Sequence, residues 1–243
     1  MTVPLLKVEN LCVNYGHIEA TRGISIEVGE GEFVGVIGSN GAGKSSTMKA
    51  VAGVIKPVSG TIQFAGKPVH GLQSHEMVRR GVALVPEGRF VFADQSTEEN
   101  LILGGFVQAE RNGVGAIRED IDRMYQLFPR LKERRSQLAG SLSGGEQQML
   151  VIARGLMSRP RLLMIDELSL GLAPKILDFL FPVLVELNRQ GLSILLVEQI
   201  ATRALAVTTR AYVMENGHVK LSGVSSQLAH DPAVMEAYLG KQH

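Results

Sequence analysis

The 243-residue sequence predicts an α/β fold with an antiparallel β subdomain near the N-terminus and an inserted helical subdomain. Three observations predict it. Residues 38–45 form a glycine-rich segment between a short apolar run and a helical pattern. Apolar runs at 162–165 and 193–197 have the length and composition of buried strands. Between the glycine-rich segment and these two apolar runs, residues 97–140 show helical patterns with polar breaks and no strand pattern.

Strand patterns dominate the first part of the chain. The expected strands are residues 5–13, 24–28, 33–37, 61–64 and 82–85. The first, second and fourth of these predict an antiparallel sheet, with Tyr15 in the connection after the first strand. One expected helix runs from Ser46 to its end at Gly53, and a second covers 74–80.

Helical patterns dominate the second part. The expected helices are one that starts at Glu98, then 116–128, 144–157 and 174–190. Pro182 is expected to kink or break the last of these, since proline lacks an amide N–H and its ring clashes with the preceding turn. Residues 212–221 predict a hairpin that turns at Asn216-Gly217. Asp231 is expected to cap a final helix that has Pro232 at its first position.

These elements predict a single domain over 1–243. In it, 1–96 and 158–243 form the α/β core with the antiparallel β subdomain, and 97–157 form the helical subdomain. The formal charge of +1 gives no electrostatic case for nucleic acid. One cysteine, no secretory signal pattern and no apolar run of about 20 residues predict a soluble, cytoplasmic protein.

The glycine-rich segment reads GSNGAGKS and fits the phosphate-binding pattern G-x-x-x-x-G-K-[ST]. A strand, a glycine turn and a helix N-terminus direct successive backbone N–H groups into one concavity, and the helix dipole adds partial positive charge. Lys44 is expected to reach the β- and γ-phosphates, and the Ser45 hydroxyl to ligate Mg²⁺. The segment therefore predicts binding of a nucleoside triphosphate. The expected binding residues are Gly38, Ser39, Asn40, Gly41, Ala42, Gly43, Lys44, Ser45 and Ser46.

Two acidic residues follow the apolar run at 162–165. An apolar strand that delivers a carboxylate beside a phosphate-binding loop is typical of a Mg²⁺ site, which predicts that role for Asp166. Glu167 comes directly after it and is placed to polarise an attacking water.

Residues 142–148 read LSGGEQQ and predict a second anion-binding helix N-terminus, formed by Ser143, Gly144 and Gly145. A nucleotide bound by one phosphate-binding loop does not require a second such segment, and the helical subdomain is expected to carry this segment far from Lys44. The economical explanation is that it binds the γ-phosphate of a nucleotide held by another chain.

With this segment the chain resembles the ATP-binding-cassette (ABC) ATPases over essentially its full length. The resemblance implies a P-loop NTPase fold with a RecA-like core, and two cassettes that dimerise head to tail around two ATP molecules. It implies that Tyr15 stacks on adenine, that Lys44 and Ser45 hold phosphate and Mg²⁺, and that Glu167 is the general base. It also implies that Ser143 and Gly145 contact the partner's ATP.

Three departures narrow the resemblance. Glu87 stands where most cassettes have a lid glutamine, and it is expected either to add a metal ligand or to repel the γ-phosphate. Gln199 stands where most have a switch histidine, and Ala173 where most have an aspartate. Together they resemble the ATPase subunit of high-affinity branched-chain amino acid importers. Leu168 and Pro182 depart even from that branch.

This resemblance implies a second, more standard cassette, two membrane permeases and an external solute-binding protein as partners, and a place on the inner face of the cell membrane. Phe90 and Phe92 are expected either to dock a permease helix or to pack beneath the lid loop. Three alternatives stay open. They are the ATPase of a transporter for lipid export or another solute, a non-transport cassette ATPase, and a binding module with an inactive site.

Overall fold

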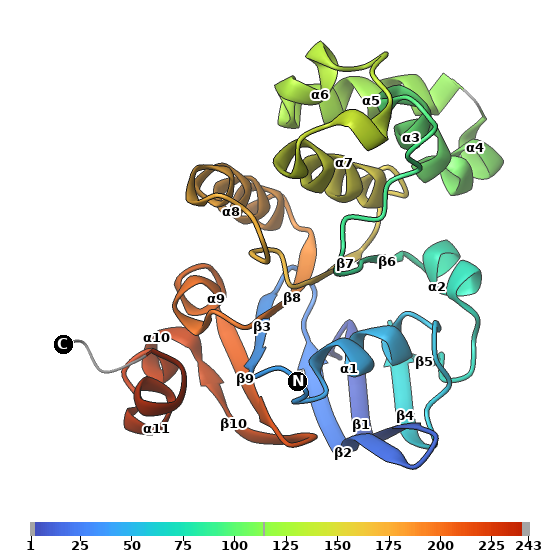
Figure 1. Cartoon of the computed structure of the whole chain (residues 1–243). Coiled ribbons are helices and arrows are strands. Elements are labelled where there is room, and N and C mark those ends of the chain that lie inside the picture. Colours follow the sequence, from blue (N-terminus) through green and yellow to red (C-terminus); the bar gives the residue numbers. More distant parts are fainter. Residues whose placement is uncertain (1–2, 114, 240–243) are drawn as a thin grey trace.

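The computed structural model describes residues 3–113 and 115–239, which contain two β-sheets and a group of helices (Figure 1). The antiparallel sheet has the order β2 (Ile18–Val28), β1 (Leu6–Tyr15), β4 (Ser59–Phe64) and β5 (Lys67–Pro68). The larger sheet has the order β10 (His218–Val224), β9 (Arg210–Glu215), β3 (Phe33–Gly38), β8 (Ser193–Glu198), β7 (Leu162–Asp166) and β6 (Val82–Val85). In the larger sheet β9, β3, β8, β7 and β6 are parallel, and β10 pairs antiparallel with β9.

The larger sheet separates two apolar cores. Alternate side chains of β3 point to opposite faces, so that Phe33 and Ile37 enter one core while Val34 and Val36 enter the other. One core lies between this sheet, the antiparallel sheet and α1 (Lys44–Val51). The other is shared with α8 (Pro174–Arg189), α9 (Ala201–Val207) and the helices of the second part. Because both faces are covered, β3, β7 and β8 are continuously buried, which explains their unbroken apolar runs.

The regular elements among the described residues between β6 and β7 are all helices, apart from an isolated bridge between Ser96 and Leu138. They are α3 (Thr97–Gly104), α4 (Phe106–Asn112), α5 (Gly115–Leu127), α6 (Pro129–Glu133), a 3₁₀ turn (Ala139–Ser141) and α7 (Gly144–Leu156). Figure 1 shows them grouped at one end of the molecule, away from the antiparallel sheet. The division into a core and an inserted helical subdomain stays a prediction.

Several boundaries differ from the expected ones. The strand expected at 5–13 continues to Tyr15, which pairs with Ile18 and is therefore not in the connection. The helix after the glycine-rich segment begins at Lys44 rather than Ser46. Pro182 does not break α8, because buried side chains on the same helix, Phe181 and Leu184 among them, keep it packed against the core.

The end of the chain follows its expected pattern. The β9–β10 hairpin turns at Asn216 and Gly217, both with positive φ, as a tight hairpin turn requires. Asp231 caps α11 (Pro232–Val234), accepting from the N–H groups of Ala233 and Val234. A π-helical turn (Met235–Leu239) follows, and α10 (Ser225–Leu228) precedes the cap. The remaining helix, α2 (Ser74–Arg80), leads into β6 as expected. Among the described residues, no helix is both long and apolar enough to cross a membrane.

Candidate active site

The glycine-rich segment connects the end of β3 to the first residue of α1, which is Lys44. Gly43 precedes the helix with a φ of 98°, a left-handed conformation that favours glycine. A Cβ atom on Gly43 would lie 2.4 Å from the carbonyl oxygen of Ala20, so strand β2 closes off any side chain there. This conformation of the segment therefore requires glycine at position 43.

The ammonium group of Lys44 lies at the centre of this loop and is almost fully buried. Its Nζ donates to the carbonyl oxygens of Gly38 at 2.9 Å and Ser39 at 3.1 Å. It also lies 3.2 Å from Oε1 of Glu167. The loop backbone and one carboxylate thus hold a cation at the N-terminus of a helix, where the helix dipole also favours an anion.

Strand β7 places Asp166 beside α1, where Oδ1 of Asp166 accepts a hydrogen bond of 3.0 Å from the Ser45 hydroxyl. Asp166 is buried, and this burial raises the pKa of its carboxyl group above the ordinary range. The negative charges of Glu167 and Glu87 raise this pKa further, while the Ser45 hydrogen bond lowers it. A buried carboxylate among other carboxylates gains stability from a nearby cation.

Ser45 and Asp166 fit a Mg²⁺ ion, because the ion prefers oxygen ligands and two oxygens here lie side by side. Within residues 3–113 and 115–239, no group of three or more histidine, cysteine, aspartate or glutamate side chains could hold a metal ion. Mg²⁺ typically takes one or two protein ligands and completes its shell with waters and substrate phosphates. The arrangement therefore suits an ion that arrives with a polyphosphate.

Glu167 adopts an unusual backbone conformation with φ of 52°. Its N–H donates to the carbonyl oxygen of Val197 on β8 at 3.0 Å, so the strand pairing of β7 continues through this residue. The next residue, Leu168, is fully buried in the core. This turn directs the Glu167 side chain back toward Lys44 instead of along the sheet.

A cavity of about 450 Å³ opens in front of Lys44 and collects most of the expected binding residues. Residues 40–46 form one wall, Tyr15 and residues 18–20 from the first hairpin form another, and Glu87, Glu167 and Leu170 complete the lining. Asp166 lines a smaller adjoining cavity that shares Glu167 and Leu170. Tyr15, Glu87, Lys44, Ser45 and Glu167 are therefore brought together by folding, although they are far apart in sequence.

Six expected residues lie outside both cavities. Gly38 and Ser39 lie at the end of β3 and directly after it, Gln199 is exposed after the end of β8, and Ser143, Gly144 and Gly145 lie at the start of α7. The Ser143 hydroxyl donates to Oε2 of Glu146 at 2.7 Å, in a capping box. The start of α7 does not line the Lys44 cavity, and its service to another chain stays a prediction.

Sequence reasoning gave no role to Arg89 or Glu198, and the structure places both against the loop that follows Glu167. Nη2 of Arg89 donates to the carbonyl oxygens of Leu170 and Gly171, each at 2.7 Å. Oε1 of Glu198 accepts from the backbone N–H of Ser169 at 2.9 Å, and Oε2 accepts from its hydroxyl at 2.6 Å. Glu198 carried a recognisable signal, since it ends an apolar strand as Asp166 does; Arg89 carried none.

The fold and this site have known counterparts. The ABC transporter family model matches residues 21–169. The chain is 44% identical over 236 residues to the high-affinity branched-chain amino acid transport ATP-binding protein BraG of Pseudomonas aeruginosa, covering 97% of this chain and all of that one. A relative named for another cargo, the lipopolysaccharide export system ATP-binding protein LptB of Haemophilus influenzae, is 29% identical and covers 98% of each chain.

Among solved structures, the ADP conformation of MJ1267, an ATP-binding cassette of an ABC transporter, superimposes with a TM-score of 0.85 at 25% identity. The alignment covers 99% of this chain and all of that one. The family match and the full-length similarity to BraG agree with each other and with the phosphate-binding loop, the buried acid and the LSGGEQQ segment described above. This chain therefore belongs to the ABC transporter family, as an ATP-binding cassette.

Proposed function

We propose that this chain hydrolyses ATP as one of two cassettes of an importer for branched-chain amino acids, bound to permeases on the inner face of the cell membrane. The observation that carries the proposal is the single cavity in which Lys44, Ser45 and Glu167 meet, with Asp166 directly behind. The identity of 44% to BraG over nearly the whole chain supports the choice of solute.

Phosphate binding falls to Lys44 and the N-terminus of α1. The Lys44 ammonium and the backbone N–H groups of the loop offer positive potential to the β- and γ-phosphates in a nearly water-free position. Tyr15 lies at the open side of the same cavity, half exposed, where its ring is available to stack on adenine. Ser45 and Asp166 would hold Mg²⁺, which neutralises phosphate charge when bound.

Glu167 is the general base of this proposal. Its carboxylate accepts the proton of a water that attacks the γ-phosphate, as a base within hydrogen-bond reach of that water can. The present partner of the carboxylate is Lys44, at 3.2 Å. A phosphate that draws the Lys44 ammonium toward itself weakens this ion pair, so that the carboxylate becomes available for the water. Substrate binding and activation of the base are thereby coupled.

The second cassette completes the site from the other side. In a head-to-tail pair, Ser143, Gly144 and Gly145 of each chain would face the γ-phosphate held by the other. Closure then needs ATP to contact both chains, so the binding free energy of ATP drives the conformational change. The exposed position of Gln199 and the carboxylate of Glu87 in the Lys44 cavity support a difference between the two sites of a heterodimer.

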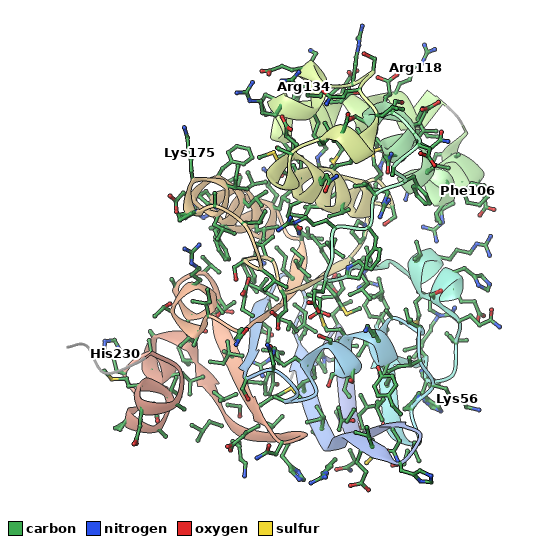
Figure 2. The ribbon with its side chains drawn as sticks, in the orientation of Figure 1. Lys56, Phe106, Arg118, Arg134, Lys175 and His230 are labelled. Carbon is green, nitrogen blue, oxygen red and sulfur yellow. The ribbon has the colours of Figure 1, made fainter. Side chains whose placement is uncertain are left out.

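A groove between the helical group, α2 and β6 supports a permease contact. Its cavity measures about 430 Å³, and its lining includes Phe92 from the loop after β6, Leu103 from α3 and Phe106 from α4. Phe90 and Phe92 are 65% and 50% exposed, which supports docking over packing beneath the lid loop. Phe106 projects outward at the edge of this region (Figure 2). An exposed apolar groove of this kind suits an amphipathic helix.

The test is reconstitution of the chain with its permeases and partner cassette in lipid vesicles. We expect the solute-binding protein loaded with leucine, isoleucine or valine to stimulate ATP hydrolysis and to drive uptake. A panel of other amino acids and amides is the control for the solute. Stimulation by another solute alone would keep the ATPase and refute the proposed cargo, and ATP hydrolysis without any permease association would favour a non-transport cassette.

A further inference from the structure

We propose that Glu198 is a positioning residue for hydrolysis: its buried carboxylate fixes the loop 168–172 and, through it, the carboxylate of Glu167. The inference rests on the proposed function in that it takes Glu167 as the base. Glu198 does not touch the Lys44 cavity itself, so it acts through the loop and not on the substrate.

The contact is specific to one residue of the loop. Glu198 is the last residue of β8 and has no exposed surface. Both of its carboxylate oxygens are used on Ser169, one by the backbone N–H at 2.9 Å and one by the hydroxyl at 2.6 Å. Two hydrogen bonds to two different groups of Ser169 fix the backbone and the side chain together.

The position of Ser169 makes this contact relevant to Glu167. Glu167 is held on its own N–H by the carbonyl oxygen of Val197, and two residues later Ser169 is held by the carboxylate of Glu198. Val197 and Glu198, which are adjacent on β8, therefore hold the chain at Glu167 and again at Ser169. Glu167 has φ of 52°, a conformation that costs free energy for a residue with a side chain and persists only where its surroundings hold it.

Burying a carboxylate at this position costs free energy, so its presence here indicates a specific role. Burial raises the pKa of the Glu198 carboxyl group, and the negative charge of Glu167 raises it further, while the two Ser169 hydrogen bonds and the charge of Arg203 lower it. An apolar side chain would fill the same space without that cost. Hydrogen bonds to an ionised acceptor are shorter and stronger than neutral ones, which suits a rigid support for a loop.

Arg89 donates to the same loop further along, at the carbonyl oxygens of Leu170 and Gly171. Its hydrogen bonds do not involve Ser169, which Glu198 holds. The two supports therefore act on different parts of the loop. A variant at Ser169 tests the contribution of Glu198 without disturbing the Arg89 contacts.

The experiment compares Ser169→Ala, Glu198→Gln and the double variant with Ser193→Ala. Ser193 is the matched control, because it also lies on β8, is fully buried and hydrogen-bonds through its hydroxyl, but at the opposite end of the strand. Each variant is assembled into the transporter. We measure kcat, the KM for ATP, nucleotide affinity, and amide hydrogen exchange over 167–172.

We expect Ser169→Ala and Glu198→Gln to lower kcat by about tenfold or more, because small misplacements of a catalytic group cost up to about 10² in rate. Nucleotide affinity and KM should stay within about twofold, since the phosphate-binding loop is untouched. The double variant should be no slower than the worse single one, because both changes weaken the same contact: Ser169→Ala removes the hydroxyl hydrogen bond, and Glu198→Gln removes the charge of the acceptor. Hydrogen exchange over 167–172 should accelerate in these variants and stay unchanged in Ser193→Ala.

Unchanged kcat or unchanged hydrogen exchange in Glu198→Gln would overturn the proposal. So would a loss of kcat that accompanies equal losses of stability and nucleotide affinity, as a general folding defect produces. If the loop exchanges faster in Glu198→Gln but the wild-type transporter hydrolyses no ATP, the support of the loop stands as a purely structural device and the proposed function is refuted.

Discussion

The Nζ atom of Lys44 lies 3.2 Å from Oε1 of Glu167, so the cation of the phosphate-binding loop and the acid that follows β7 are paired inside the cavity. Both side chains are largely buried, which makes the pair stronger than an exposed one and makes its loss costly. In the proposed function each partner also acts on the substrate. The two single-residue variants that break this pair should therefore differ in their consequences.

Lys44→Ala should abolish measurable ATP binding. The phosphate charge loses its cation, and removal of one partner from a buried, charged contact costs affinity by about 10² or more. Isothermal titration with ATP in the presence of Mg²⁺ is the measurement. Lys49→Ala, on the same helix but outside the cavity, is the control and should bind ATP normally. Normal affinity in Lys44→Ala would refute the assignment of the loop.

Glu167→Gln should keep ATP binding and slow hydrolysis by about 10² to 10⁴, because an amide cannot accept the proton of the attacking water. Affinity for ATP should not fall, since the amide no longer competes as an anion for Lys44. We expect the variant to accumulate with bound ATP in a stable pair with its partner cassette, as measured by single-turnover kinetics and gel filtration. Wild-type turnover would show that another group is the base.

Asp166→Asn should raise thermal stability at pH 7 in the absence of nucleotide and Mg²⁺. Burial raises the pKa of Asp166 above its ordinary value of 3.8, so the folded chain binds this proton more tightly than the unfolded chain. The free energy of unfolding therefore falls as pH rises from 3.8 through the raised pKa, so the wild-type chain carries this cost on the alkaline side of 3.8. The amide removes that cost.

Each kcal/mol recovered raises Tm by about 2–4 °C in a domain of this size. The gain of Asp166→Asn should shrink as pH falls through the raised pKa and vanish below 3.8, where the wild-type carboxyl is protonated in both states. Asp94→Asn at an exposed position is the control and should change Tm little at any pH. A gain that is independent of pH would assign the effect to packing instead of charge.

Unequal roles for the two ATP sites predict unequal effects of Ser143→Arg and Gln199→Ala in the assembled transporter. Ser143→Arg should nearly abolish ATPase stimulation by loaded binding protein, because a bulky side chain at the exposed start of α7 blocks closure over the partner's ATP. Gln199→Ala should leave much of the stimulation, since Gln199 lies outside the Lys44 cavity. The opposite ranking would make this chain's own site the main motor.

The parts of the site that local pattern could predict are those in which one short segment carries the function. The glycine-rich segment, the acids after β7 and the start of α7 each have such a pattern, and the structure places the first two together. The pairing of Lys44 with Glu167 has no local signal, because 123 positions separate the two residues and only the order of strands in the sheet brings them together.

The same reasoning explains why the sequence did not identify Glu198 and Arg89 as residues that hold the loop 168–172. Glu198 and Arg89 act on Ser169, Leu170 and Gly171 through contacts between loops at one edge of the sheet, and a single sequence does not reveal which loops meet. The strand extension to Tyr15 and the continuity of α8 through Pro182 are tertiary effects too. In each case packing overrides a local preference.

The capping box at Ser143 means that the start of α7 already holds an anion of its own. The Glu146 carboxylate accepts hydrogen bonds from the Ser143 hydroxyl at 2.7 Å and from the Ser143 backbone N–H at 2.9 Å. This contact lowers the pKa of Glu146. A phosphate from a second chain would have to displace this carboxylate as a competitor. Docking would then be an exchange of one anion for another, so that the lost Glu146 contacts offset part of the free energy gained from the phosphate and ease separation of the chains after each cycle.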